Sequence, residues 1–163
     1  MTDLGTLGGT DSLASAINAS GTVVGISWTL GNTSRHAFLY SGGTMTDLGT
    51  LGGDFGFAQG INDSGQVVGE SYTSDGYTHP FLYSDGVMTD LNTEIPYSSG
   101  WELGWAFAIN DAGQIVGQGI HNGQYDAFLL TPQIATAPEP GFWVPLLACL
   151  GCIAVWKLRK NTV

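Results

Sequence analysis

Short runs of apolar residues, interrupted every few positions by turn residues, characterise the first 131 positions of the chain. In the first of these stretches, residues 16–17 (AI) lead through an Asn-x-x-Gly turn into residues 23–24 (VV), which predicts a β-hairpin. Residues 38–40 (FLY) then turn through 41–43 (SGG) into 44–48, which predicts a second hairpin. No apolar stripe recurs at helical spacing, and each glycine would cost a helix about 1 kcal/mol. The pattern predicts an all-β domain.

The same pattern recurs about every 44 residues, so the chain contains internal repeats. The first nine residues (MTDLGTLGG) return unchanged at 45–53, and the first four of them return at 88–91. Residues 17–25 (INASGTVVG) return as 61–69 (INDSGQVVG) and as 109–117 (INDAGQIVG). We number the repeats one to three along the chain.

Each repeat carries four short strand patterns, which is the size and content of a β-propeller blade. Residues 1–4 count as a lone strand, two complete units follow, and three more strands precede Pro132, enough for about three four-stranded blades. Closed propellers usually have about 4 to 8 blades, so we expect an incomplete or open array. A closed three-bladed ring, completed by the lone strand, is the alternative. Met1 falls at the repeat position of Met45 and Met88, which favours a chain that begins inside a repeat.

Charge is scarce and one-sided in this chain. Charged residues make up 11% of it, against roughly 25% in a typical soluble domain, and the net charge is −10. Arg35 is the only basic residue before Lys157, so the repeats are strongly acidic. A nucleic-acid partner is excluded because neutralising phosphates requires a basic face.

The composition changes at Pro132, where the repeats (residues 1–131) end. Residues 132–141 are rich in proline and small residues, which predicts a linker. Residues 142–156 carry no charge and have tryptophans near both ends, which predicts a short transmembrane helix; a buried core segment is the alternative. Residues 157–163 form a basic tail, which predicts a cytoplasmic end with the repeats outside the cytoplasm. The basic cluster at the membrane stop consists of Lys157, Arg159 and Lys160.

The end of the chain combines Pro138, Glu139 and Pro140 with the apolar stretch and the basic cluster. This three-part arrangement resembles the PEP-CTERM sorting signal of Gram-negative bacteria, which implies an exosortase-type processing enzyme as a partner. The repeats resemble the HAF family of extracellular repeats, through residues 36–38 (His-Ala-Phe). Together the resemblances imply an exported protein that is anchored in the membrane by its C-terminus, or released to the cell surface or biofilm matrix after processing.

Candidate metal and redox groups have simpler structural interpretations. His36 and His79 share a repeat position, but the third unit has Asp126 there, so no repeated metal site is predicted. Cys149 and Cys152 lie in the apolar segment and are expected to act as small apolar residues. Acidic turns offer oxygen ligands, so calcium stays as the alternative to plain turn chemistry, and no other cofactor is predicted. These turns are residues 62–65, 74–76 and 110–113.

No G-x-S-x-G, H-E-x-x-H or P-loop motif occurs in the sequence, so no catalytic residue is assigned. The strongest motifs occur in every unit, which favours a role in building the fold. An insertion at residues 93–105 of the third unit carries Tyr97, Trp101 and Trp105. These aromatic residues are expected to plug the core of the last blade; the alternative is that they contact the sugars of an extracellular polysaccharide.

We therefore expect a non-enzymatic, exported repeat protein of the cell surface or extracellular matrix, sorted through its C-terminal signal by an exosortase. A carbohydrate-binding propeller module is the first alternative, and a propeller glycoside hydrolase is the second.

Overall fold

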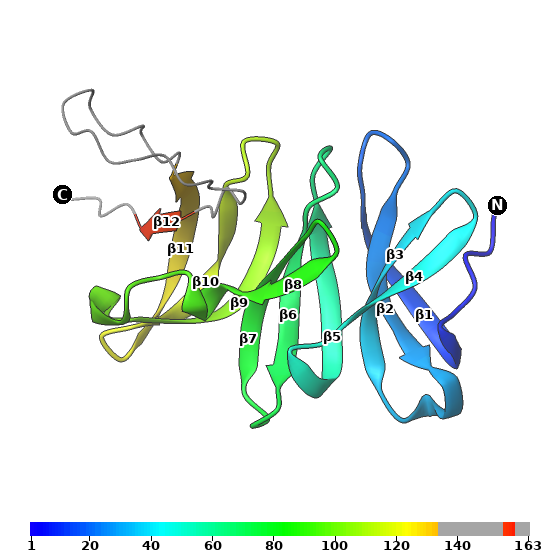
Figure 1. Ribbon diagram of the computed structural model, residues 1–163, viewed down its shortest axis with the longest axis horizontal. Helices are drawn as coiled ribbons and strands as arrows, with labels where there is room; N and C mark the ends of the chain where they lie inside the picture. Colours follow the sequence, from blue (N-terminus) through cyan, green and yellow to red (C-terminus); the bar gives the residue numbers. More distant parts are fainter. Residues whose placement is uncertain (134–154, 159–163) are drawn as a thin grey trace, which may run out of the picture.

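The computed structural model describes residues 1–133 and 155–158, which form β-strands joined by turns and by three short 3-10 segments. This confirms the predicted all-β class. The strands of each repeat form an antiparallel meander, and the three meanders stand side by side along the long axis of the molecule (Figure 1). Among the described residues, no helix is long and apolar enough to cross a membrane.

The first sheet consists of β1 (Gly8–Ile17), β2 (Val23–Thr29), β3 (Arg35–Ser41) and β4 (Thr44–Gly49). The second sheet consists of β5 (Gly52–Ile61), β6 (Val67–Thr73), β7 (Thr78–Ser84) and β8 (Val87–Asp90). The third sheet consists of β9 (Trp101–Ile109), β10 (Ile115–His121) and β11 (Gln124–Gln133), with the short β12 (Val155–Leu158) at its edge. The 3-10 segments are η1 (Leu30–Asn32), η2 (Leu91–Thr93) and η3 (Tyr97–Ser99).

Consecutive strands within each repeat pair with one another, which confirms the predicted hairpins. One parallel pairing, between Arg35 and Phe55, joins the first two sheets into an eight-stranded mixed sheet. The Arg35 guanidinium reinforces this junction because it lies 5.1 Å from the ring centroid of Trp28 and 5.2 Å from that of Phe55.

The prediction of a strand at residues 1–4 is wrong. Residues 1–6 form no strand, and Leu7 makes an isolated bridge to Thr29. The equivalent residues 45–48 do form a strand, because they return along β3 in a hairpin. In the described part of the chain no strand runs beside residues 1–4, so their backbone groups have no ladder to join.

The hydrophobic core lies in two layers between the sheets. The first interface, between the first and second sheets, consists of Val24, Ala37, Leu48, Ala58, Ile61, Val67 and Phe81. The second interface, between the second and third sheets, consists of Val68, Leu91, Ile95, Leu103, Ala106, Ile115, Phe128 and Leu130. Val67 and Val68 belong to different interfaces because successive side chains of a strand point to opposite faces. The second sheet is therefore apolar on both faces.

A glycine follows the paired apolar residues of β2, β6 and β10 because the neighbouring strand approaches too closely for a side chain. A Cβ built on Gly69 would overlap the carbonyl oxygen of Phe57 in β5. The same overlap with the preceding strand occurs at the equivalent Gly25 and Gly117. The close approach of two backbones, and not a left-handed φ, requires glycine here.

The asparagines of the repeated turns connect one sheet to the next. The Nδ2 of Asn18 donates to the carbonyl oxygen of Asn62 at 3.1 Å, and the Nδ2 of Asn62 donates to that of Asn110 at 3.1 Å. We call these two contacts the Asn ladder. The recurring turn motif therefore also forms a contact between neighbouring repeats.

Aspartates add a second set of contacts beside the Asn ladder. The backbone N–H of Ala19 donates to Asp63 Oδ1 at 2.8 Å, and that of Asp63 donates to Asp111 Oδ1 at 2.9 Å. We call these contacts the Asp rungs. Two of the acidic turns that were considered for calcium therefore use a carboxylate oxygen to bind the preceding repeat.

The C-terminal predictions lie mostly outside the described residues. These include the sorting motif Pro138, Glu139 and Pro140, residues 142–154 of the expected helix, and Arg159 and Lys160. The structure describes Val155–Leu158 as a strand, β12, paired with residues 130–133 of β11. The last two residues of the expected helix and Lys157 thus lie in a strand, because the edge of β11 offers free backbone groups for pairing. The transmembrane helix itself stays a prediction.

Candidate functional site

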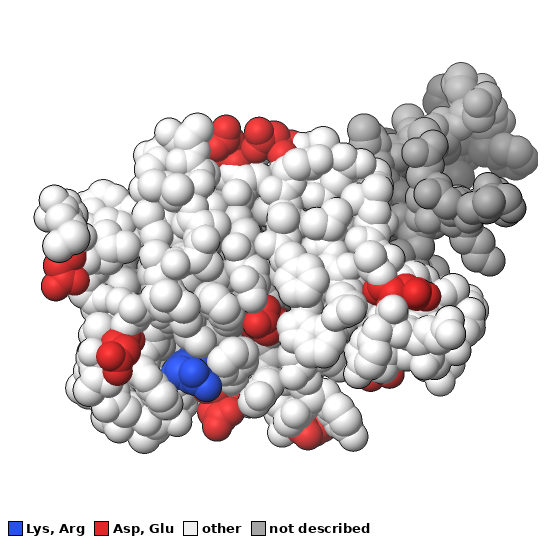
Figure 2. All heavy atoms as spheres, turned by 180° about the vertical axis from the view of Figure 1, so that it is seen from behind, with Lys and Arg blue, Asp and Glu red and all other residues white. Residues whose placement is uncertain are grey.

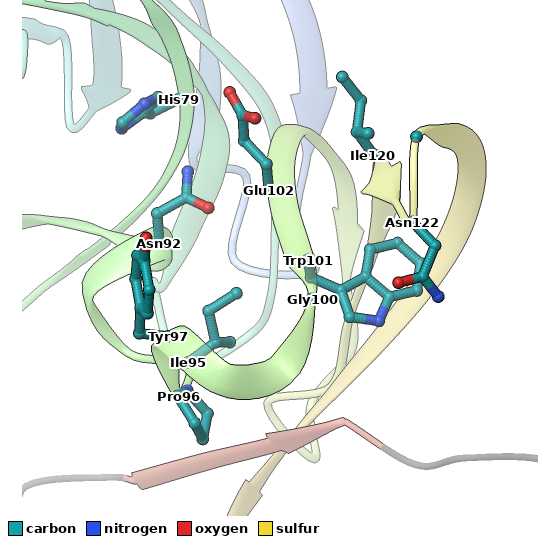
Figure 3. A pocket seen from close by; sticks show the side chains of 11 residues that line it. His79, Asn92, Ile95, Pro96, Tyr97, Gly100, Trp101, Glu102, Ile120 and Asn122 are labelled. Atoms are coloured by element: carbon teal, nitrogen blue, oxygen red, sulfur yellow. The ribbon is translucent and has the colours of Figure 1, made fainter.

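A pocket of about 510 Å³ lies where the insertion of the third repeat meets β9 and the β10–β11 turn. Its wall combines the aromatic side chains of Tyr97 and Trp101 with the polar side chains of His79, Asn92 and Glu102 (Figure 3). Pockets that bind small molecules typically measure about 300–1,000 Å³ and mix apolar walls with a few polar groups. The size and lining of this pocket suit a ligand of that class.

Hydrogen bonds to the backbone hold the insertion in place. Asp90 caps η2, because its Oδ1 accepts the backbone N–H of Asn92 at 2.9 Å. The Asn92 side chain pairs with β9 as a strand would: Nδ2 donates to the Leu103 carbonyl oxygen at 2.9 Å, and Oδ1 accepts the Leu103 N–H at 2.8 Å. Gly100, with φ of 74°, makes the left-handed turn from η3 into β9.

Trp101 packs against the third sheet as well as lining the pocket. Its ring stacks on the imidazole of His121, with centroids 4.6 Å apart and planes inclined by 9°. It also meets Phe128 edge-on at 6.3 Å, and it packs against the second interface. These contacts favour the core interpretation for Trp101.

Tyr97 and Trp105 lie in different surroundings. Tyr97 in η3 is fully exposed, beside Asn92 and Ile95 in the wall of the pocket (Figure 3). Trp105 on β9 lines an adjoining hollow of about 160 Å³, which shares Glu102 and Ile120 with the pocket. The structure therefore brings Tyr97 and Trp101 to one pocket and Trp105 to its neighbour.

The histidines of the first two repeats each contact an aspartate across a hairpin. His36 Nδ1 lies 2.8 Å from Asp47 Oδ2, and His79 Nδ1 lies 2.6 Å from Asp90 Oδ2. Sequence reasoning missed both pairs. The available clue was that each histidine precedes its aspartate by 11 residues.

The third repeat has a histidine–aspartate contact in a different place, between β10 and β11. Asp126 stands at the histidine position, and its Oδ2 lies 3.8 Å from Nδ1 of His121. The repeated histidines therefore have carboxylate partners in the hairpins. Among the described residues, no group of three or more His, Cys, Asp or Glu side chains is placed to hold a metal ion.

Glu70 is a buried carboxyl group in β6, with 7% of the residue exposed. Burial raises the pKa of Glu70 to about 7, although hydrogen bonds from Gln59 Nε2 to both carboxylate oxygens, at 3.3 Å, oppose the rise. The equivalent residue of the third repeat is the uncharged Gln118. On the surface, acidic side chains are spread over the face shown in Figure 2, with one small basic patch between them.

Comparison with known proteins gave no match to a family model, to a curated protein or to a solved structure. Function is therefore inferred from the residues of this chain.

Proposed function

We propose that the chain is a non-enzymatic, exported repeat protein of the cell surface or extracellular matrix. One observation carries the proposal: residues that recur in the repeats contact the neighbouring repeat or strand. Asn62 bonds the third unit, Asp63 receives a bond from the first, and Gly69 permits the close approach of β5. A motif required in each unit to hold a stack together has a structural task, whereas a catalytic group is needed once.

The arrangement supports propeller-like blades in an open array. Each of the first two repeats is a four-stranded antiparallel meander, and apolar layers separate successive sheets. The strands β1 and β11 lie toward opposite ends of the molecule (Figure 1). A closed three-bladed ring would require the first and third sheets to meet, so this separation favours the open form.

Export and sorting rest on the C-terminal sequence pattern. The test is to express the full chain behind a secretion signal in a Gram-negative host that contains an exosortase-type enzyme. We expect a membrane-bound precursor and a shorter released form. Replacing Pro138, Glu139 and Pro140 with alanine should leave only the precursor, whereas alanine at Glu94 and Pro96, outside the signal, should change nothing. Release of the triple variant at the normal level would overturn the sorting proposal.

Contact with a polysaccharide is a second candidate function, favoured by the exposed ring of Tyr97 beside the pocket. An aromatic ring with a free face can stack on a sugar ring, and Glu102 adds a hydrogen-bond acceptor to the same wall. The acidic repeats would repel anionic polymers, so a neutral polysaccharide fits better.

Binding of the full chain to dextran and to alginate tests this second function. Tyr97→Ala should weaken binding to the neutral polymer about five- to tenfold, as expected for one stacking contact, without changing the melting temperature. Tyr125→Ala is the matched control, because Tyr125 is exposed but lies outside this pocket. Trp101→Ala should lower the melting temperature, since Trp101 packs in the third sheet. Equal binding by the Tyr97 and Tyr125 variants would refute the assignment of the site.

A further inference from the structure

The outer face of the third sheet exposes apolar residues that the first two sheets bury. Val24, Val68 and Val116 occupy the same repeat position. Val24 and Val68 are 0% exposed because the next sheet covers them, whereas Val116 is 43% exposed. Leu129, its cross-strand partner on β11, is 39% exposed. We call Val116 and Leu129 the forward face.

The outer face of the first sheet likewise exposes an apolar position that the second and third sheets pack against a neighbour. Ile17 is equivalent to Ile61, which is 9% exposed within the first interface, and to Ile109, which packs against the second interface. Ile17 itself is 67% exposed, and it pairs with Val23 of β2. We call this outer face, marked by Ile17, the rear face. Each end of the stack therefore presents the apolar positions with which the inner repeats bind a neighbour.

The Asn ladder also stops at both ends of the described repeats. The Nδ2 of Asn110 donates to Gln114 Oε1 of its own turn, and no further described repeat supplies the carbonyl oxygen that Asn62 finds in Asn110. At the other end of the described repeats, the Asn18 carbonyl oxygen accepts the N–H of Gly21, and none of the described asparagine side chains donates to it. The donor at one end and the acceptor at the other are complementary.

We propose that the forward face of one copy of this chain binds the rear face of a second copy. Val116 would then be covered as Val68 is within the chain, Ile17 would be covered as Ile61 is, and Asn110 would donate to Asn18 of the next copy. A second copy is the expected partner because its first sheet carries the same repeat motif as the sheets that cover Val24 and Val68 within the chain. The two faces differ, so the contact is heterologous and extends into head-to-tail chains.

Ala19 limits the strength of this association. In the second and third repeats, Asp63 and Asp111 accept an N–H from the preceding unit, but the first repeat has Ala19 at this position. The Asp111 N–H of another copy would therefore find no carboxylate there. Ala19→Asp supplies the missing acceptor and should tighten association about tenfold, as expected for a hydrogen bond to a charged group.

Sedimentation velocity of the full chain, in a non-ionic detergent that shields the C-terminal apolar segment, measures the assembly. The wild type should grow from monomer to dimer and longer species as concentration rises. Val116→Glu and Ile17→Glu should each give a monomer, because each places a charge in one of the two faces. Val87→Glu is the matched control, since Val87 is 61% exposed on the second sheet, away from both faces, and this variant should assemble normally. Unchanged circular dichroism would establish that all variants are folded.

Mixing the two monomeric variants gives the decisive result. The Val116→Glu copy keeps an intact rear face, and the Ile17→Glu copy keeps an intact forward face, so an equimolar mixture should form dimers that grow no further. A monomeric wild type, assembly of either single variant like the wild type, or a mixture that stays monomeric would each overturn the proposal. Dimers of one variant alone would show that a face pairs with itself, which would also overturn it.

Discussion

Replacing Asn62 with alanine should destabilise the protein more than the same change at the equivalent Asn110. Asn62 is 3% exposed, and its side chain makes three hydrogen bonds. Its Nδ2 donates to Gln66 Oε1 at 2.8 Å and to the Asn110 carbonyl oxygen at 3.1 Å, and its Oδ1 accepts the Gln66 N–H at 2.9 Å. Asn110 makes the two corresponding bonds to Gln114 in its own turn, but it is exposed.

The contrast in burial sets the size of the effect. A hydrogen bond contributes about 0.5–1.5 kcal/mol net, and more when a buried partner is left unsatisfied. Asn62→Ala should therefore cost about 3 kcal/mol, whereas Asn110→Ala should cost about 1 kcal/mol because water replaces its lost partners. For a chain of this size these losses correspond to falls in melting temperature of about 10 °C and about 3 °C. Asn18→Ala, which removes one contact to the next sheet from a half-buried turn, should fall between them.

Urea and thermal unfolding of the full chain, followed by tryptophan fluorescence, measures all three variants. The expected order of destabilisation is Asn62, then Asn18, then Asn110. If Asn62→Ala does not fold, the comparison of Asn18 with Asn110 still tests the contact between sheets. Equal losses at these positions would show that the Asn ladder contributes nothing to stability and would refute the reasoning.

Two further predictions concern the interior of the sheets. The pKa of Glu70 is raised from 4.5 to about 7 in the folded chain, so stability should decline as pH rises from about 4.5 to about 7. Glu70→Gln should then stabilise the protein by up to about 3 kcal/mol near pH 8 and by little near pH 4.5, as measured by urea unfolding. Glu102→Gln, at an exposed position, is the control. An equal gain in stability at both pH values, or a similar gain from the control variant, would contradict this. Gly69→Ala should prevent folding or lower the melting temperature by more than about 10 °C, because its Cβ overlaps β5. Gly104→Ala is the control, since its Cβ would meet only Gln118 O at 3.5 Å, and equal circular dichroism melts for the two variants would refute the packing argument.

The strands and hairpins of the repeats were predictable because they depend on residues close together in the sequence. Alternating apolar residues and Asn-x-x-Gly turns mark the hairpins of all three units. Residues 1–4 show where this reasoning fails. The same four residues form a strand at 45–48 and none at 1–4, because a strand requires a neighbour with which to pair.

The pocket could be predicted only in part. The insertion and its aromatic residues were visible as a departure from the repeat, but the stacking of Trp101 on His121 joins residues of two different strands. The pairing of Asn92 with Leu103 likewise depends on how the insertion folds back onto β9. No local pattern separates Trp105 from Tyr97 and Trp101, and the strand register places it in another hollow.

The repeat period, the turns, the acidic charge and the change of composition at Pro132 can all be read from neighbouring residues. The burial of a side chain cannot be read from neighbouring residues, because it depends on what packs against each face of a sheet after folding. Val68 and Val116 belong to the same motif, yet the first lies within the second interface and the second is exposed. Their difference arises because, among the described residues, a further sheet covers Val68 and none covers Val116, which is a property of the packed stack of repeats.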